Sequence, residues 1–238
     1  GTDDHKVNEP LSSPDVTPLI REAIRLRYRL MAYRYDLAWQ ASVEDEPMLR
    51  PTFLGHEQDP LTYEECDDFM LGRDLLVASV VEQGARSRKV YLPRNQGGWY
   101  DWHSGKAFAA GETITLDAPL DRLPLLVRAG AVIPLGECET TTDARRDTVR
   151  QWQLWPAPEG VTTQGEMFDD DGESHGWQQG NALWLSWTLC SSASRIDLTV
   201  EKRGDYQPAW REIALLLPAG ERRELWVNGE KAASYRLG

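Results

Sequence analysis

The densest group of chemically versatile side chains in this sequence is the run Asp169–Glu173, which holds four carboxylates and is followed by Ser174. Carboxylate oxygens at this density can bind a hard cation such as Ca²⁺. The spacing differs from that of an EF-hand loop, however, and Gly172 suits a turn with positive φ. The run therefore predicts a hairpin tip whose Asp side chains accept hydrogen bonds from nearby amides, and we expect no metal site.

Two further acidic pairs, Glu64-Glu65 and Asp67-Asp68, come directly before an apolar run. Paired carboxylates can perform acid–base catalysis when they face each other across a substrate. Nothing in the spacing places these pairs opposite each other, and a charged approach to a buried strand is the simpler interpretation. We therefore assign no catalytic residue here.

The histidines and glycines do not form a recognisable motif. No HxH, HExxH or nucleophile-elbow pattern includes a histidine, so each is interpreted as a loop residue. The four are His5, His56, His103 and His175. Gly84 and Gly97-Gly98 neither precede a helical pattern nor fall in a GxxxxGK sequence, so we expect no phosphate-binding loop and no cofactor.

Tryptophan is the other residue type of interest, because an exposed indole can stack on the apolar face of a sugar ring. Trp184 and Trp187 lie an odd number of positions apart and so face opposite sides of one strand, which assigns at least one of them to packing. We expect about seven of the ten indoles to fill cores or interfaces. Those in or beside predicted strands are Trp99, Trp102, Trp177, Trp184, Trp187, Trp210 and Trp226.

Composition excludes several classes of protein. The 238 residues carry a formal net charge of -12, which opposes binding to nucleic acid. No apolar run reaches the roughly 18 residues that suggest a membrane span. Hydrophobic residues make up 41% of the chain, as in ordinary globular proteins. The length favours two globular units.

Cysteine use bears on the compartment. Cys66, Cys138 and Cys190 are odd in number, far apart and without CxxC spacing. Three free thiols in a reducing compartment are the simplest interpretation, which predicts a cytoplasmic protein. No basic and apolar leader follows Gly1, so we expect no signal peptide in this sequence.

The elements that would position these residues begin with a helix. Thr17 can cap it and Pro18 fits its first turn, after a polar loop that holds Pro10 and Pro14. From Leu19 to Ala41 apolar residues recur at three- and four-residue steps on more than one side. The pattern predicts one long helix packed between two neighbours.

After Pro47 the pattern changes to short strands separated by turns. The expected fold is mainly β, with two antiparallel β-sandwich domains over residues 47–140 and 141–238, preceded by one long helix in 1–46. Residues 139–147 lose hydrophobicity and predict a connector, and Asn228-Gly229 predicts a type I′ hairpin. The first predicted strands are Met48–Leu54, Asp74–Val81, Lys89–Leu92, Thr113–Leu116 and Leu125–Arg128. The second set is Trp152–Trp155, Gly165–Phe168, Leu183–Leu189, Ile196–Val200, Ile213–Leu217 and Glu224–Val227.

A series of segments, taken in order, resembles glycoside hydrolase family 31, the family of α-glucosidases and α-xylosidases. The segments are Leu26–Tyr33, Met48–Leu54, Phe69–Ala78, Tyr91–Pro93, Gly98–Asp101, Asp117–Asp121, Arg122–Leu135 and Phe168–Ser174. The resemblance implies that residues 1–46 are the end of a (β/α)8 barrel and that the two β units are the family's proximal and distal C-terminal domains. It fades beyond about residue 180.

The resemblance also implies a function. Family members are retaining hydrolases with an aspartate nucleophile in a Trp-x-Asp-Met-Asn-Glu type motif and a second aspartate as acid/base. Neither motif occurs here, so no catalytic residue is assigned, substrate-binding residues stay unknown, and His5 receives no role. The chain is interpreted as a C-terminal region that supports the catalytic barrel and is inactive alone. Its expected partners are that barrel and, for the parent enzyme, a carbohydrate substrate.

Five apolar residues are expected to contribute to this support by burying apolar area. They are Leu125, Leu126, Val127, Val132 and Ile133. Two alternatives remain open. One is a carbohydrate-binding β-sandwich module that uses exposed tryptophans. The other is a homo-oligomer that associates through the apolar helix at Leu19–Ala41.

Overall fold

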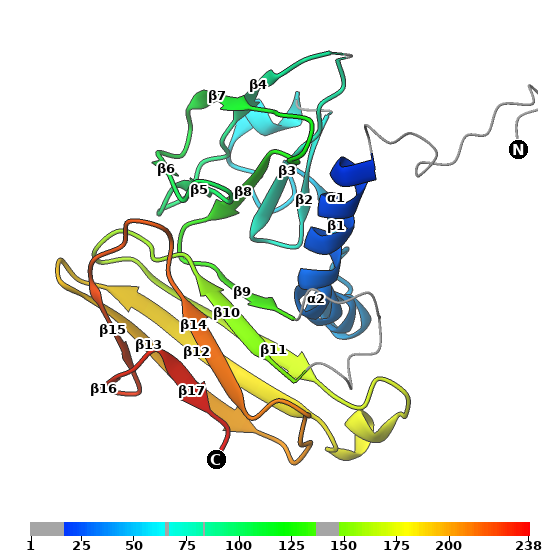
Figure 1. Ribbon diagram of the computed structural model, residues 1–238, viewed down its shortest axis with the longest axis vertical. Coiled ribbons are helices and arrows are strands. Elements are labelled where there is room, and N and C mark those ends of the chain that lie inside the picture. Colours follow the sequence, from blue (N-terminus) through cyan, green and yellow to red (C-terminus); the bar gives the residue numbers. More distant parts are fainter. Residues whose placement is uncertain (1–16, 65–66, 83, 137–147) are drawn as a thin grey trace, which may run out of the picture.

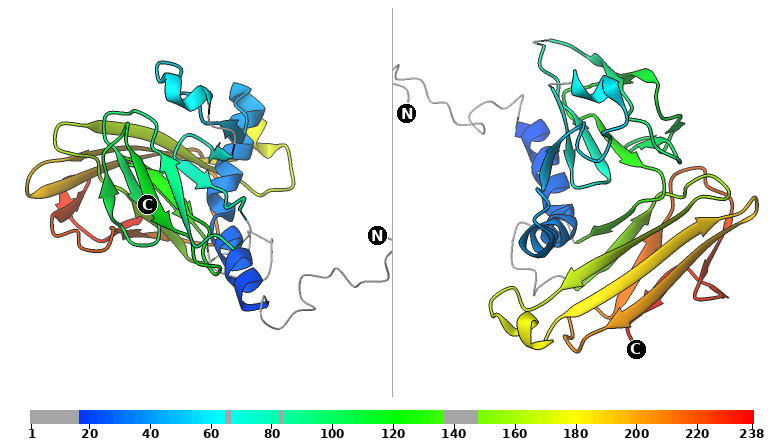
Figure 2. Two further views of the ribbon diagram at one scale, coloured as in Figure 1. Left: turned by 90° about the horizontal axis from the view of Figure 1, so that it is seen from above. Right: turned by 180° about the vertical axis from the view of Figure 1, so that it is seen from behind.

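The computed structural model describes residues 17–64, 67–82, 84–136 and 148–238. Two β units lie one above the other, with two helices along one side (Figure 1; Figure 2). Several sequence predictions lie outside the described residues, among them the N-terminal loop and the connector at 139–147. The single residues in this group are His5, Glu65, Cys66 and Cys138.

The predicted helix is present as two segments, α1 (Thr17–Arg29) and α2 (Met31–Glu44). Leu30 separates them with φ -79° and ψ 5°, and Figure 1 shows α1 and α2 running in different directions. The backbone stays bonded on both sides, since Leu30 N donates to Leu26 O at 3.0 Å and Arg34 N to Leu30 O at 2.9 Å. The Leu30 side chain is buried in the same apolar cluster as Tyr33 of α2, so the bend occurs at a packed position.

The first β unit contains a six-stranded sheet in the order β1-β2-β3-β8-β5-β6 and a two-stranded sheet, β4-β7. All their pairs are antiparallel, as predicted. The core of this unit includes Met70, Leu76, Trp99 and Leu126. The strands are β1 (Leu49–Pro51), β2 (Asp68–Leu71), β3 (Leu75–Ala78), β4 (Ser87–Tyr91), β5 (Trp99–Asp101), β6 (Ala107–Phe108), β7 (Thr113–Asp117) and β8 (Leu125–Arg128).

The second β unit is built from a four-stranded sheet, β17-β14-β10-β9, and a five-stranded sheet, β11-β12-β13-β15-β16. The strands are β9 (Val132–Leu135), β10 (Arg150–Leu154), β11 (Thr162–Asp169), β12 (Leu183–Ser191), β13 (Arg195–Arg203), β14 (Glu212–Leu216), β15 (Glu224–Val227), β16 (Glu230–Lys231) and β17 (Ser234–Arg236). Two short 3₁₀ helices complete the described elements, Pro60–Tyr63 and Gly176–Gln179.

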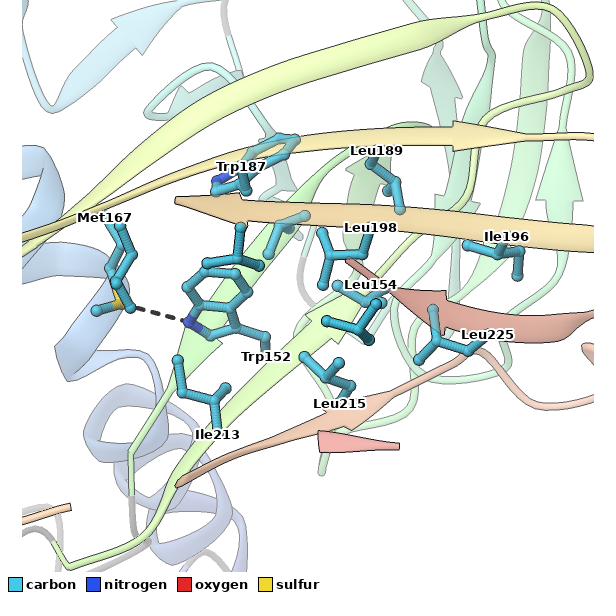
Figure 3. Packing of buried hydrophobic residues seen from close by; sticks show 14 of the residues in the cluster. Trp152, Leu154, Met167, Trp187, Leu189, Ile196, Leu198, Ile213, Leu215 and Leu225 are labelled. Atoms are coloured by element: carbon cyan, nitrogen blue, oxygen red, sulfur yellow. Dashed lines mark hydrogen bonds between the residues drawn. The ribbon is translucent and has the colours of Figure 1, made fainter. Parts of the chain in front are cut away.

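The core of the second unit is centred on a buried tryptophan, as Figure 3 shows. Trp152 is fully buried, and its Nε1 donates to the Met167 sulfur at 3.3 Å. Leu154 and Ile213 pack in the same cluster from the four-stranded sheet, and Trp187 packs in it from the five-stranded sheet. The side chains of both sheets therefore fill one shared core, as in a β-sandwich.

Hydrogen bonding differs from the expected antiparallel scheme at two places, because β10 pairs with β14 and β13 with β15 in parallel. In addition, β9 pairs with β10, so backbone bonds cross the division predicted at residues 140/141. The Asn228-Gly229 hairpin between β15 and β16 is confirmed, with φ 49° and 84°. Positive φ at both central residues is the geometry of a type I′ turn.

The helices pack on both β units through a shared apolar cluster. Tyr33 and Leu37 of α2 join residues of β3, β8 and β9 there. The five residues expected to contribute to barrel support are buried within this chain, with exposures of 4% or less, and their contribution to a barrel stays a prediction. They are Leu125, Leu126, Val127, Val132 and Ile133. Within the described ranges, no helix combines the length and apolarity that a membrane span needs.

Candidate functional site

A groove of about 760 Å³ lies between α2 and the second β unit. Strand β11, which forms one edge of the five-stranded sheet, runs along it. The β2–β3 turn, at Arg73 and Asp74, lines it as well. The groove therefore joins three parts of the chain that are far apart in sequence.

The floor of the groove is set by strand register. Residues directly paired across β11, β12 and β13 share one face of the sheet, and so do residues two positions along each strand. Two consecutive rows of polar side chains result, Glu166–Ser186–Glu201 and Gln164–Thr188–Thr199. Within the first row, Ser186 Oγ donates to Glu166 Oε2 at 2.9 Å.

The wall opposite this floor is α2. Asp36, Gln40 and Glu44 line the groove at intervals of four residues, which places them on one face of the helix. Asp36 is buried, and its Oδ1 accepts a hydrogen bond from Phe168 N of β11 at 2.6 Å. Burial raises the pKa of Asp36 well above its usual value, although the Phe168 amide and the Arg150 charge oppose that shift.

Two further contacts hold α2 to the β11–β12 hairpin. Tyr35 Oη donates to Asp170 Oδ1 at 2.5 Å. The Trp39 indole stacks on Phe168, with ring centroids 4.8 Å apart and an interplanar angle of 8°. Together with the Asp36 bond they form a contact that we call the α2–hairpin clamp, defined by Tyr35, Asp36 and Trp39.

Opposite charges meet where the groove reaches the first β unit. Arg73, Asp74 and Arg128 line this end. Burial raises the pKa of Asp74, whereas the nearby Arg128 charge acts in the opposite direction. Arg128 also lies 3.2 Å from His56 Nε2, and its guanidinium is 5.8 Å from the Trp99 ring centroid.

The acidic run Asp169–Glu173 forms the turn that the sequence predicts. Gly172 has φ +68°, and its N–H donates to Asp170 Oδ1 at 2.8 Å. Asp171 Oδ1 accepts from the amides of Glu173 at 3.0 Å and Ser174 at 2.9 Å. In the part of the chain that the structure describes, no three His, Cys, Asp or Glu side chains are arranged to hold a metal.

Asp169 differs from the rest of this run because its side chain faces the interior. It forms an ion pair with Arg150 at 3.4 Å and accepts a hydrogen bond from Trp210 Nε1 at 3.1 Å. Burial raises its pKa, and the Arg150 charge is the main opposing influence. Asp169 therefore connects β11 to Arg150 of β10 and to Trp210 inside the second β unit.

Among the acidic candidates that the structure describes, which leave out Glu65, none is brought together with another across a cleft. Asp68 is buried and paired with Arg88 at 2.5 Å, whereas Asp67 and Glu64 are exposed.

The tip at Gly97-Gly98 is a turn, in which Asn95 Oδ1 accepts from both amides at 2.9 Å and 2.5 Å.

The described histidines have separate surroundings. His56 Nδ1 donates to Thr52 O at 2.8 Å, while burial and the Arg128 charge lower its pKa. His103 Nε2 donates to Leu123 O at 2.9 Å, and His175 is exposed beside a 3₁₀ helix.

Cys190 is a half-buried free thiol. Because Cys66 and Cys138 lie outside the described residues, the compartment predicted from the three cysteines stays a prediction.

All ten tryptophans lie in the described ranges, and none of them is exposed. Six are buried: Trp99, Trp152, Trp155, Trp184, Trp187 and Trp210. The other four, Trp39, Trp102, Trp177 and Trp226, are half-buried. As predicted, Trp184 and Trp187 face opposite sides of β12, since Trp187 packs in the sandwich core and Trp184 packs beside the clamp.

A second surface of interest is α1. Within the described part of the chain, none of its 13 residues is buried, and Ile24 is 43% exposed. Apolar side chains are also exposed in the loop after β1, where Phe53 and Tyr63 stack with centroids 5.3 Å apart. An uncovered helix with apolar positions is typical of a surface that another protein segment covers.

Sequence reasoning missed the groove. Its six floor residues belong to three strands, and each one resembles an ordinary solvent-facing side chain when considered alone. The available signal was the alternation at Gln164/Glu166, Ser186/Thr188 and Thr199/Glu201, where polar residues recur at every second position. The α2 wall could not be added without the tertiary fold.

Residues 45–133 match the family described as "Glycosyl hydrolase family 31 C-terminal domain". Among curated proteins, the chain is 27% identical over 213 residues to Alpha-glucosidase 2 of Bacillus thermoamyloliquefaciens, covering 90% of this chain and 27% of that enzyme. It is 31% identical over 221 residues to Neutral alpha-glucosidase AB of Sus scrofa, covering 92% and 23%. The chain thus spans about a quarter of the length of these relatives.

Solved structures agree with these matches. A GH31 dextranase of Flavobacterium johnsoniae, complexed with isomaltotriose, superposes with a TM-score of 0.86 at 30% identity and covers 95% of this chain and 28% of its own. The GH31 alpha-xylosidase of Xanthomonas citri gives a TM-score of 0.78 at 26% identity, covering 94% and 25%. These matches extend well past residue 180, and so do the sequence matches, which cover 90% and 92% of the chain; the expectation that the resemblance fades beyond residue 180 is therefore wrong.

Proposed function

We propose that this chain, which belongs to the C-terminal region of glycoside hydrolase family 31, packs against a catalytic barrel and stabilises it through α1. The observation that carries the proposal is the exposure of α1, whose residues find no buried position within the described structure. Burying side chains such as Ile24 against a barrel would contribute about 1.5–3 kcal/mol each.

The position of α2 supports the same role. Tyr33 Oη donates to Leu71 O of the first β unit at 2.9 Å, and Asp36 accepts from Phe168 N of the second. One helix is thereby fixed to both β units, while α1 continues from it with a free face. A barrel that packs on α1 would be held by the whole C-terminal region.

For the whole protein we propose hydrolysis of α-glycosides with retention of configuration, performed by a barrel that this chain supports. The names of the similar proteins, α-glucosidases, a dextranase and an α-xylosidase, favour this class of substrate. Retaining hydrolysis uses two carboxyl groups about 5–5.5 Å apart. We assign neither to this chain, since Asp36, Asp68 and Asp169 are engaged by backbone or arginine partners.

The test of the supporting role compares Ile24→Glu in two contexts, the isolated chain and a polypeptide in which a family 31 barrel precedes it. In the isolated chain Ile24 is exposed, so the melting temperature should stay nearly unchanged. In the barrel-bearing polypeptide a buried charge should lower the melting temperature and the yield of active enzyme. Arg21→Glu, on the same helix, is the matched control. Equal effects of Ile24→Glu in both contexts would refute the role.

Self-association through α1 is a second candidate, favoured by the same exposed helix. Light scattering of the isolated chain over a range of concentrations separates it from the first, because a homo-oligomer gives a mass that rises with concentration. The tryptophan-based carbohydrate-binding module is not favoured, because no indole is exposed.

A further inference from the structure

We propose that the groove between α2 and β11 binds a neutral oligosaccharide. This inference goes beyond the supporting role of the chain and does not depend on it. The site uses the polar floor and the helical wall of the groove in place of an exposed indole platform.

The floor offers hydrogen-bonding groups of complementary kinds. The row Glu166–Ser186–Glu201 presents two carboxylates on either side of a hydroxyl, and the next row adds an amide and two hydroxyls. Ligand hydroxyl groups can donate to the carboxylates and also accept from the amide and hydroxyl groups. Each ring of an oligosaccharide carries hydroxyl groups that can both donate and accept hydrogen bonds.

The wall adds an apolar indole surface and an amide. Trp39 lines the groove with its ring, whereas its Nε1 is buried and has no hydrogen-bond partner among the described residues, so it is not offered to a ligand. Gln40 follows it on α2 and lines the groove too. One face of the Trp39 ring is stacked on Phe168, which fixes the indole in place without help from a ligand. A prearranged wall reduces the entropy that binding must offset.

The charges of the lining select against other ligands. Asp36, Glu44, Asp74, Glu166 and Glu201 are its acids, and Arg73 and Arg128 its cations. An anion would meet an excess of carboxylates. A cation would meet the two arginines as well as the five acids, and one of the two floor rows carries no charge. A neutral polyhydroxylated ligand fits the complete lining.

The experiment titrates the 238-residue chain with maltotriose and isomaltotriose, followed by calorimetry and by the fluorescence of Trp39 and its neighbours. Spermidine and an oligogalacturonate of similar length serve as cationic and anionic comparators. The proposal predicts saturable binding of at least one neutral trisaccharide and no comparable binding of either comparator. Binding confined to spermidine or to the oligogalacturonate would overturn it, as would the absence of saturable binding to all four compounds.

Variants locate the site. Glu201→Gln with Thr199→Ala removes one charged and one neutral group from exposed positions on the floor, so the fold is kept. The affinity should fall about tenfold or more, as expected for a lost hydrogen bond to a charged group. Thr162→Ala with Glu230→Gln changes exposed residues that do not line the groove and should leave the affinity unchanged. Equal affinities of both double variants would place binding elsewhere and overturn the proposal. The Ile24→Glu comparison tests the supporting role separately, so failure of one inference is distinguishable from failure of the other.

Discussion

Gly165 and Trp187 are paired across β11 and β12, and their contact depends on the absence of a side chain on Gly165. A Cβ atom on Gly165 would lie 2.5 Å from Trp187 Cζ2 and 2.8 Å from Cε2. Because the indole belongs to the core of the second β unit, it cannot move away without disturbing that core.

We therefore predict that Gly165→Ala lowers the free energy of unfolding by about 1–3 kcal/mol, as in other overpacked cores. Urea denaturation of the isolated chain measures this change. Gln164→Ala changes the neighbouring, exposed residue and is the matched control. A Gly165→Ala variant as stable as the control would mean that the indole does not lie against this backbone.

Asp36 makes a prediction about pH. Because its pKa is raised in the folded chain, the folded state binds a proton more strongly than the unfolded state, whose Asp has a pKa of about 3.9. The stability associated with this proton is fully present below that pH and is lost as the pH rises through the raised pKa. Asp36→Asn keeps an oxygen that can accept from Phe168 N but cannot titrate.

The free energy of unfolding of the wild-type chain, minus that of Asp36→Asn, should therefore fall as the pH rises from about 4. Urea denaturation at a series of pH values measures this difference, and Asp205→Asn provides the control for an exposed aspartate. A difference that stays constant or grows with pH would contradict the assignment.

At the scale of elements, the α2–hairpin clamp decides how the second β unit is held. Tyr35→Phe removes the hydrogen bond to Asp170 while keeping the ring. We expect a loss of about 0.5–1.5 kcal/mol of stability and faster amide hydrogen exchange in residues 170–182. Tyr28→Phe on α1 is the matched control. Unchanged exchange at the hairpin would show that the Tyr35 bond does not restrain it.

Local sequence patterns were sufficient for the positions of many strands. The predicted strands Leu125–Arg128 and Glu224–Val227 coincide with β8 and β15, because compact apolar runs bounded by turn residues define such strands without reference to the rest of the chain. The Asn228-Gly229 hairpin was predicted for the same reason, since its turn chemistry is contained in two residues.

Features that depend on contacts between distant segments could not be predicted from local sequence patterns. The parallel pairing of β10 with β14 joins strands separated by more than fifty residues, and no local pattern specifies such a register. The break at Leu30 falls in a continuous helical pattern and is visible only where the two segments pack. The groove likewise requires α2 and β11 to be adjacent, which the tertiary fold decides.

For the whole molecule, the arrangement of two β units bridged by α2 describes a scaffold (Figure 2). We predict that the purified 238-residue chain does not hydrolyse p-nitrophenyl α-glucoside, since we assign it neither carboxylate of a retaining pair. Release of p-nitrophenol, compared with a buffer blank and a complete family 31 enzyme as positive control, measures this directly. Turnover that persists through purification would mean that a catalytic pair is present in this chain.

The most direct test of the supporting role is amide hydrogen exchange of α1, measured by mass spectrometry over residues 19–29 in the isolated chain and in the barrel-bearing polypeptide. Because α1 has no buried residue in the described structure, its amides should exchange quickly in the isolated chain and become strongly protected beside a barrel. Equal exchange of α1 in the two contexts would contradict the claim that a barrel packs on this helix.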